Sequence, residues 1–174
     1  MSGIAGIIGK KNVKEKYEKK FLKMIKTLTH RGPDETWVFL KEKCLLGHTY
    51  LNTNNEEAFR EYKNLVIIYD GVLYNSKTNT DTETILKLYA RYKEKALQKL
   101  NGLFAFAIWD GKRLLLARDR VGAKPLFYTI KNKNLIFASE LKAILAHPEI
   151  KPIITKHSLQ ELLALGPSRT PGCG

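Results

Sequence analysis

Cysteine is scarce in this sequence, and no apolar run is long enough to cross a membrane. Cys44 and Cys173 are the only cysteines, so they cannot form a disulfide framework, and they share no metal-ligand spacing. A spanning helix needs about 18 apolar residues in succession, and the N-terminus lacks a charged region followed by an apolar segment. We therefore expect a cytoplasmic protein in a reducing compartment, with no metal, no other cofactor and no membrane partner.

Acidic residues are scarce relative to basic ones. The sequence has 30 Lys and Arg against 17 Asp and Glu, and its formal net charge is +13. This excess raises the question of a nucleic-acid partner, but the lysines are scattered, and the densest group, residues 10–26, is interrupted by Glu15 and Glu18. No recognition motif accompanies the charge. A solvated, lysine-rich surface is the favoured interpretation, and nucleic-acid binding ranks last among the functions considered.

The length of 174 residues and the hydrophobic content of 44% fit one globular domain with a full core. No internal repeat is present, and only residues 166–174 have the composition of a linker. We expect one domain over residues 1–165.

Residues 1–9 form an apolar run with small residues interleaved, which predicts a buried strand. Removal of Met1 would give Ser2 a free α-amine beside its hydroxyl. Such an amine titrates near ~7.7 to 8.0, and it can act as the base for its own side chain, as in N-terminal nucleophile enzymes. The alternative is that these residues only begin a core strand, and by themselves they favour this structural interpretation.

The spacing of apolar residues alternates along the chain between helical and strand periods. Helices are expected over residues 14–28, 80–100, 140–146 and 159–165. Beyond the first nine residues, strands are expected over residues 36–40, 44–47, 64–69, 72–74, 102–109, 113–117, 125–130 and 135–138. Thr80 and Glu83 form a capping box at the start of the second helix. Strands followed and preceded by helices predict an α+β sandwich whose sheets are covered by helices.

The pair Asp-Gly occurs twice between apolar runs, at Asp70-Gly71 and Asp110-Gly111. Each pair predicts a tight hairpin, because a type I′ turn needs a positive φ at both central positions. Trp37 and Trp109 fall in expected strands and are assigned to the core. The four histidines show no metal-ligand spacing and are interpreted as loop or cap residues, namely His30, His48, His147 and His157.

Several strings are more specific than this general pattern. They are residues 2–7 (SGIAGI), 30–34 (HRGPD), 46–48 (LGH), 81–83 (DTE), 101–107 (NGLFAFA), 117–120 (ARDR) followed by Gly122 and 124–126 (KPL), and 137–143 (FASELKA). In this order they resemble the N-terminal glutaminase domain of glutamine-dependent asparagine synthetase, a class II glutamine amidotransferase. The resemblance covers nearly the whole chain. It implies a four-layer αββα Ntn-hydrolase sandwich, in which two antiparallel sheets lie between helix layers.

The resemblance also implies a function and its partners. In that family the domain hydrolyses glutamine and passes ammonia to a C-terminal, ATP-using synthetase domain. The pyrophosphate loop of a synthetase domain, with the pattern Ser-Gly-Gly-x-Asp-Ser, does not occur here, and residues 166–174 resemble the start of the crossover towards it. The implied partners are glutamine or another small amide and a separate synthetase domain or subunit.

Carried over residue by residue, the family's site departs from its pattern at several positions. The nucleophile, a cysteine in the family, is Ser2, and a hydroxyl is a weaker nucleophile than a thiol. The arginine that holds the substrate carboxylate falls on Tyr50, followed by Leu51, and a phenol cannot make a charged bidentate contact. The oxyanion hole falls on Asp70 and Gly71, where an ionised Asp70 would oppose the developing negative charge.

Three further positions bear on substrate binding. Val72 replaces the family's glutamate, and an aliphatic side chain cannot recognise a polar head group. Asp81 matches the ligand of the substrate amine, but an acidic residue also suits the start of a helix, and the two interpretations are evenly weighted. Arg31 is a candidate for substrate binding, although Arg31 with Asp34 is more often a pair that ties a loop to the core, as is Arg118 with Asp119.

Three functions therefore compete. The first is a silenced glutaminase that keeps the fold and docks onto a synthetase partner, since nucleophile, anchor and oxyanion donor all change together. The second is an active N-terminal-serine amidohydrolase with an altered amide substrate. The third is nucleic-acid binding, which rests on charge alone. The chain between Asn55 and Leu65 also lacks the family's Gln-Pro-Met segment, so the region that covers glutamine is expected to differ.

Overall fold

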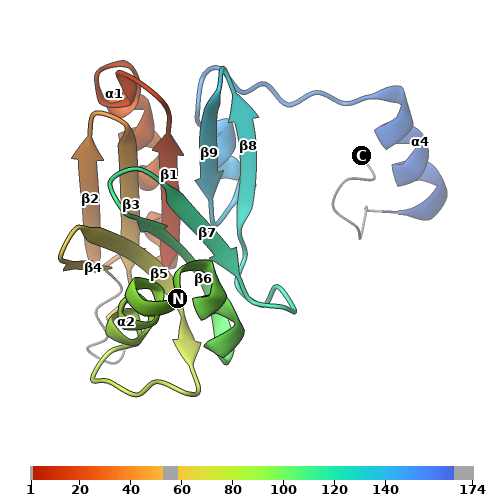
Figure 1. Cartoon of the computed structure of the whole chain (residues 1–174). Coiled ribbons are helices and arrows are strands. Elements are labelled where there is room, and N and C mark those ends of the chain that lie inside the picture. The colour runs from red at the N-terminus through yellow and green to blue at the C-terminus, as the bar shows by residue number, and fades with distance from the viewer. Residues whose placement is uncertain (1, 53–58, 167–174) are drawn as a thin grey trace.

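Two antiparallel sheets form the centre of the protein, and the computed structural model describes them within residues 2–52 and 59–166 (Figure 1). The first sheet has the strand order β2-β3-β1-β9-β8. Its strands are β1 (Gly3–Ile8), β2 (Glu35–Lys41), β3 (Cys44–Tyr50), β8 (Phe127–Lys131) and β9 (Asn134–Ala138). The second sheet has the order β4-β5-β6-β7. Its strands are β4 (Phe59–Tyr62), β5 (Leu65–Leu73), β6 (Gly102–Trp109) and β7 (Leu114–Arg118).

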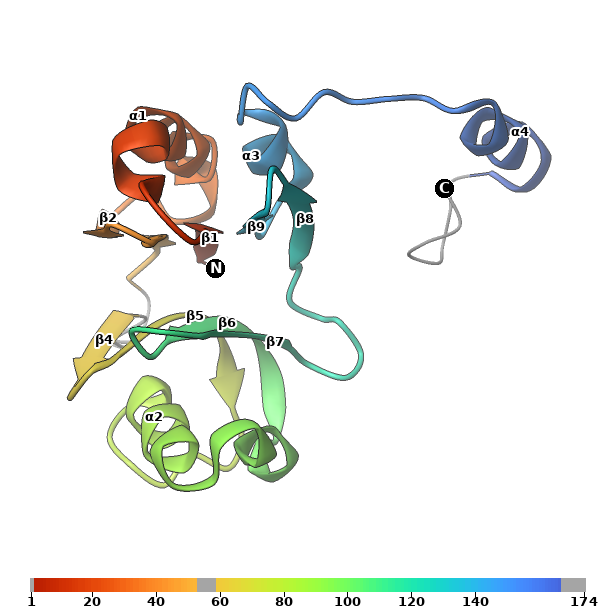
Figure 2. The ribbon, with the colours of Figure 1, turned by 45° about the horizontal axis from the view of Figure 1, so that its top comes forward.

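Helices cover the outer faces of the two sheets, as Figure 2 shows. The first sheet packs against α1 (Val13–Lys26) and α3 (Leu141–Leu145), and a 3₁₀ turn, η1 (Thr29–Arg31), follows α1. The second sheet packs against α2 (Asp81–Tyr92) and the 3₁₀ segment η2 (Lys93–Lys99). The four-layer αββα sandwich expected from the resemblance is therefore confirmed. A last helix, α4 (Lys156–Leu165), lies apart at the end of an extended segment.

The alternation of side chains along each strand builds this layering. In β1, Ala5 and Ile7 pack towards α1, whereas Ile4 points into the layer between the sheets. Ile68 of β5 and Phe137 of β9 meet Ile4 in that layer. Because both faces of the central strands are covered, β1 and β5 are apolar at nearly every position, as the sequence of residues 1–9 predicts.

The hairpin predicted at Asp70-Gly71 is wrong. β5 continues through both residues to Leu73, and Gly71 pairs with Phe104 of β6. A Cβ atom on Gly71 would lie 2.5 Å from the carbonyl oxygen of Leu103 and 2.9 Å from the Cα of Phe104. Glycine therefore serves here to let two backbones approach closely, and no turn is required.

The hairpin predicted at Asp110-Gly111 is confirmed between β6 and β7, but its type I′ turn is wrong, because Gly111 has a positive φ of 90° and Asp110 does not, and the loop covers residues 110–113. The third hairpin, between β8 and β9, turns on Asn132 at φ 50° and Lys133 at φ 62°. Two successive positive φ values match the twist of the flanking strands, as in a type I′ turn. Both tryptophans lie in the core between the sheets, as predicted.

Helix boundaries differ from their predictions in α4, which begins at Lys156 and not at residue 159, and at the end of α2. Thr80 caps α2 as expected, because its side chain accepts a hydrogen bond from the backbone nitrogen of Glu83. The helix predicted to reach residue 100 ends at Tyr92, where Lys93 takes a positive φ of 52° and η2 begins. β4 was not predicted. The region that covers glutamine in the family was expected to differ here, and it lies partly in residues 53–58, which are outside the described residues. Residues 167–174 of the expected linker are also outside them.

Within the described residues, none of the helices could span a membrane. In the same part of the chain, no three His, Cys, Asp or Glu side chains are grouped so that they could hold a metal ion. Burial raises the pKa of the Cys44 thiol far above its ordinary value, so this cysteine behaves as a small apolar core residue.

We predict that the layer between the sheets dominates stability. Phe137 of β9 is 0% exposed, and its cross-strand partner Tyr128, on the edge strand β8, is 68% exposed. Phe137→Ala should lower the free energy of unfolding by about 3 to 5 kcal/mol through lost contacts and a cavity. Tyr128→Ala, the matched control, should cost less than about 1 kcal/mol. Urea unfolding of both variants measures the difference, and equal costs would contradict the layer model.

Candidate active site

Ser2 directly precedes β1 and is held by its backbone at one end of the sandwich. It is 7% exposed. Its backbone nitrogen donates a hydrogen bond to Oδ1 of Asp70 at 3.2 Å, and its carbonyl oxygen accepts one from Nε of Arg31 at 2.8 Å. The predicted nucleophile position and the predicted oxyanion position are therefore in direct contact, although they come from different sheets.

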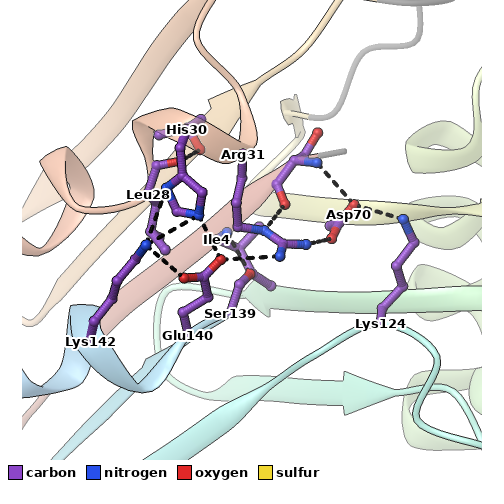
Figure 3. A network of polar contacts seen from close by, with 11 residues as sticks. Ile4, Leu28, His30, Arg31, Asp70, Lys124, Ser139, Glu140 and Lys142 are labelled. Atoms are coloured by element: carbon purple, nitrogen blue, oxygen red, sulfur yellow. Dashed lines mark hydrogen bonds and ion pairs between the residues drawn. The ribbon is translucent and has the colours of Figure 1, made fainter.

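Asp70 is the centre of this site. Its side chain extends from β5 into the layer between the sheets and is 2% exposed. Nη2 of Arg31 lies 3.3 Å from Oδ2, and Nζ of Lys124 lies 3.1 Å from Oδ1. Figure 3 shows these cations approaching from opposite sides. Two cations and one N–H donor surround this one buried carboxylate and compensate its burial.

Arg31 links Asp70 to a second carboxylate at the surface. Nη1 of Arg31 donates to Oε1 of Glu140 at 3.2 Å, so one guanidinium contacts Ser2, Asp70 and Glu140. Arg31 is the last residue of η1, and Glu140 directly precedes α3, so the group joins these two segments to β1 and β5 (Figure 3). The planar fork of arginine suits several acceptors at once. Arg31 ties a loop to the core as expected, but through Asp70 and Glu140. The Oδ2 of Asp34 instead accepts from the backbone nitrogen of Asn52.

Glu140 collects further positive charge at the edge of the site. His30 Nε2 lies 2.9 Å from its Oε1, and Lys142 Nζ lies 3.1 Å from its Oε2. Partial burial opposes the ionised form of Glu140, but hydrogen bonds from Lys142, His30 and Arg31 outweigh it and lower the pKa of the carboxyl group. Beside it, the backbone nitrogen of Ile4 donates to the Ser139 hydroxyl, and this contact fixes the end of β9 against β1.

The loop after β7 delivers Lys124 to Asp70. The Asp119 carboxylate accepts hydrogen bonds from the backbone nitrogens of Ala123 and Lys124, and Arg118 donates to the carbonyl oxygens of Gly122 and Lys124. Burial works against ionised Asp119, yet these backbone N–H groups lower its pKa. Arg118 and Asp119 thus shape one loop through its backbone and do not form the ion pair that their adjacency suggested.

Tyr50 ends β3 one step beyond the Gly3–Thr49 pair, at the same end of the sheet as Ser2. Its ring lies 5.8 Å from the ring of His48. Leu51 follows the strand and is half-buried. Tyr50, Ser2 and Asp70 are therefore gathered at one end of the fold, while the carboxylate-binding role expected for Tyr50 and Leu51 stays a prediction.

His48 lies in β3 and is 2% exposed, so its assignment to a loop or cap is wrong. Burial lowers the pKa of His48 to about 4, although Asp70 and a hydrogen bond with the Tyr69 backbone act in the opposite direction. Its Nε2 has no hydrogen-bond partner among the described residues. A neutral imidazole therefore borders the site, and sequence reasoning missed it because the apolar strand pattern gives no signal for a buried histidine.

Val72 and Asp81 lie near the end of β5. Val72 shares the face of Asp70, two residues along the strand, and is 40% exposed. Asp81 accepts hydrogen bonds at Oδ2 from the Tyr69 hydroxyl at 2.9 Å and the Leu73 backbone nitrogen at 2.8 Å. These contacts tie α2 to β5 and favour the structural interpretation of Asp81. A role for Asp81 or Val72 in substrate binding stays a prediction.

Comparison with known proteins places this arrangement in a family. Residues 1–173 match the profile described as a glutamine amidotransferase domain. The chain belongs to the glutamine amidotransferase domain family. This finding confirms the resemblance that the strings of the sequence indicated.

Curated relatives of this amidotransferase domain are similar to it over its full length. "Asparagine synthetase [glutamine-hydrolyzing] 3" of Bacillus subtilis is 41% identical, over 100% of this chain and 32% of the relative. "Putative asparagine synthetase [glutamine-hydrolyzing] 2" of Methanocaldococcus jannaschii is 35% identical, over 95% of this chain and 39% of the relative. The amidotransferase domain spans about a third of the length of the curated relatives it matches.

Solved structures share the fold of the amidotransferase domain. Glutamine phosphoribosylpyrophosphate amidotransferase of Bacillus subtilis has a TM-score of 0.64 at 20% identity, over 83% of this chain and 43% of that one. A regulatory enzyme of purine biosynthesis has a TM-score of 0.63, also at 20% identity and with the same coverage. At this identity the likeness concerns the fold alone.

Besides His48, sequence reasoning missed Lys124 and Glu140 as residues of the candidate site. Both lie within strings that carry the resemblance, but Lys124 is 54 residues from Asp70, and Glu140 is 109 residues from Arg31. No local pattern connects residues so far apart. The only available signal was the presence of unassigned charged residues in otherwise apolar or small-residue strings.

We predict that buried histidine makes the domain less stable in mild acid. The unfolded chain protonates His48 near pH 6.5, whereas the folded chain protonates it at about 4, so the free energy of unfolding falls as the pH drops through this window. The loss should be at most about 3 kcal/mol. Burial also lowers the pKa of His147, which adds to the same trend.

Urea unfolding between pH 7 and pH 5 measures this dependence. His48→Gln should remove a large part of the slope, while His157→Gln, which alters a side chain that is 73% exposed, should leave it unchanged. An unaltered pH dependence of the free energy of unfolding in His48→Gln would contradict the assignment of this dependence to His48.

Proposed function

We propose that this domain keeps the amidotransferase fold but hydrolyses glutamine weakly or not at all, and that it serves as a docking domain for an ATP-using synthetase domain or subunit. The observation that carries the proposal is the buried Asp70 carboxylate at the oxyanion position. It is 2% exposed and bound by Arg31 and Lys124. A fixed negative charge at this position opposes the negative charge that develops on the substrate oxygen.

The same carboxylate weakens the base that an N-terminal nucleophile needs. Once Met1 is removed, the nitrogen of Ser2 is an amine that lies 3.2 Å from Oδ1 of Asp70. A buried carboxylate at this distance favours the protonated ammonium. An ammonium cannot take the proton of the Ser2 hydroxyl, and a serine without a base is a poor nucleophile. One substitution in the family's pattern thus impairs both the oxyanion hole and the nucleophile.

Substrate anchoring is reduced as well. Tyr50 offers a single phenolic hydrogen bond where the family offers a guanidinium, and charged bidentate contacts are about twice as strong as neutral ones. Val72, beside Asp70, adds an apolar surface where the family has a carboxylate. These two changes support weak binding of free glutamine.

The docking role is supported by apolar side chains exposed in the second half of the chain. Among the described residues, the only large exposed apolar side chains outside residues 121–163 are Leu22, Val72 and Tyr74. Leu159, Leu162 and Leu163 follow helical spacing on α4, which lies apart from the sandwich. Exposed apolar patches are typical of surfaces that bind another protein. A synthetase domain is the proposed partner because relatives about three times as long as this chain are named asparagine synthetases.

A glutaminase assay on protein whose Met1 is shown by mass spectrometry to be removed tests the silent site. Wild type and Ser2→Cys should release glutamate at most slightly faster than the uncatalysed reaction. The combined variant Ser2→Cys, Tyr50→Arg and Asp70→Asn should exceed Ser2→Cys by at least about 10²-fold, since one oxyanion donor is worth about 10² to 10³ in rate. The charge-matched control is the combination Ser2→Cys, Tyr50→Arg and Asp110→Asn, in which the altered aspartate lies in the β6–β7 turn. Robust glutamate release by wild type or by Ser2→Cys would refute the proposal.

A second candidate function is an amidohydrolase that acts on an amide without an amino-acid head group. It is favoured because the chain keeps Ser2 and Gly71 but has Tyr50 and Val72 where the family has the polar groups that bind that head group. Covalent labelling of Ser2 by an amide-mimicking electrophile would support it. Absence of labelling at a verified free N-terminus would count against it.

Copurification with a synthetase subunit encoded in the same genome tests the docking role. The double variant Leu162→Ser and Leu163→Ser should lose the partner, while Leu22→Ser, on the exposed face of α1, should retain it. Loss of the partner in both variants would point to a general effect of surface change and would contradict a specific role for α4.

A further inference from the structure

The end of the sandwich opposite Ser2 carries a pocket of about 550 Å³, which we call the lysine pocket. It is bordered by Lys10, Lys43, Lys112 and Lys133, with Trp109 and Ile130 among its apolar walls. Ser2 and Gly9 lie at opposite ends of β1, so seven residues of extended chain, or about 23 Å, separate this pocket from the candidate active site. None of its residues takes part in the cluster around Asp70.

Each of the four lysines comes from a different chain connection. Lys10 follows β1, Lys43 lies in the turn between β2 and β3, Lys112 lies between β6 and β7, and Lys133 lies between β8 and β9. Antiparallel pairing brings these connections to one end of the two sheets. The four lysines therefore lie close together because of the sheet topology, and no run of basic residues in the sequence predicts this.

The four ammonium groups carry charge that the protein does not neutralise. Among the described residues, none of them forms an ion pair, whereas Lys16 and Lys20 both contact Glu149. The Asp110 carboxylate near Lys112 is engaged by the backbone nitrogens of Lys112 and Arg113. A hollow bordered by charges of one sign concentrates the field and attracts anions.

An adjoining hollow limits how far this basic surface extends. It contains Glu42 and Glu61 together with Lys41 and Lys63, and it shares Lys43 and Trp109 with the lysine pocket. Its charges are mixed, so the unbalanced charge of the lysine pocket does not continue into this neighbouring hollow. This confinement favours a small anion over an extended polymer, which would need a continuous basic stripe.

We propose that the lysine pocket binds a small molecule with two or more phosphate groups, of the nucleoside polyphosphate class. Lysine ammonium groups bind phosphate as point charges, and four of them match a ligand of charge about −3 to −4. The pocket volume lies in the ordinary range for small-molecule sites. Ile130, which is 70% exposed, provides apolar contact for a ring, and Trp109 also borders the pocket. This proposal is independent of whether glutamine is hydrolysed at Ser2.

Calorimetric titration of the intact chain with ATP, tripolyphosphate and inorganic phosphate at about 50 mM salt tests the site. ATP and tripolyphosphate should bind, inorganic phosphate should bind much more weakly, and affinity should fall as salt rises. The double variant Lys43→Gln and Lys133→Gln should weaken binding by at least about tenfold, as the loss of two charge-assisted contacts requires. Lys95→Gln with Lys151→Gln lowers the net charge equally at exposed sites outside the pocket and should leave affinity unchanged.

The outcomes separate the sources of binding. ATP binding more tightly than tripolyphosphate would show that the apolar wall contacts the nucleoside, and equal binding would assign the site to the polyphosphate group alone. Equal weakening in the two double variants would overturn the proposal, because it would assign binding to overall charge. Absence of heat and of thermal stabilisation with both polyphosphates would overturn it as well. Unchanged melting temperatures of the ligand-free variants verify that folding is intact.

Discussion

The buried contact between Asp70 and Arg31 is the interaction on which this structure depends. Burial of a charge is costly unless partners compensate it, and removal of one partner from such a pair typically costs about 3 to 5 kcal/mol. Asp70 comes from the second sheet, while Arg31 holds the carbonyl of Ser2 and the carboxylate of Glu140 at the first. The two sheets are therefore joined at this end by charge, whereas farther along the strands they are joined by apolar packing.

This arrangement explains why the identity of residue 70 affects several groups of the site at once. An amide at position 70 would leave Lys124 and Arg31 with less negative charge nearby, and it would leave the nitrogen of Ser2 without an anionic partner. With aspartate, the carboxylate binds Ser2, Arg31 and Lys124 together. The site is thereby organised around an anion that belongs to the protein itself. An oxyanion of a substrate would have to compete with it for the same donors.

Charge is distributed differently at the two ends of the sandwich. At the Ser2 end, His30, Arg31, Lys124 and Lys142 each contact the carboxylate of Asp70 or Glu140. At the other end, four lysines converge without acidic partners among the described residues. The sequence shows the excess of basic residues only as a net charge of +13. This number does not distinguish basic residues that contact carboxylates from basic residues that do not. The first stabilises the fold, and the second is available to a ligand.

By itself, the sequence determined the family, the layered fold and most helices and strands, because periodicity and capping act over a few residues. It also assigned Ser2, Tyr50 and Asp70 to one site through the family resemblance. Only the tertiary structure decided the meaning of Asp70-Gly71. The same dipeptide type turns at Asp110-Gly111 and continues a strand at Asp70-Gly71, because Gly71 is paired with Phe104 and crowded by the backbone of β6. The contact between Ser2 and Asp70, which are 68 residues apart, likewise exists only once the sheets have packed.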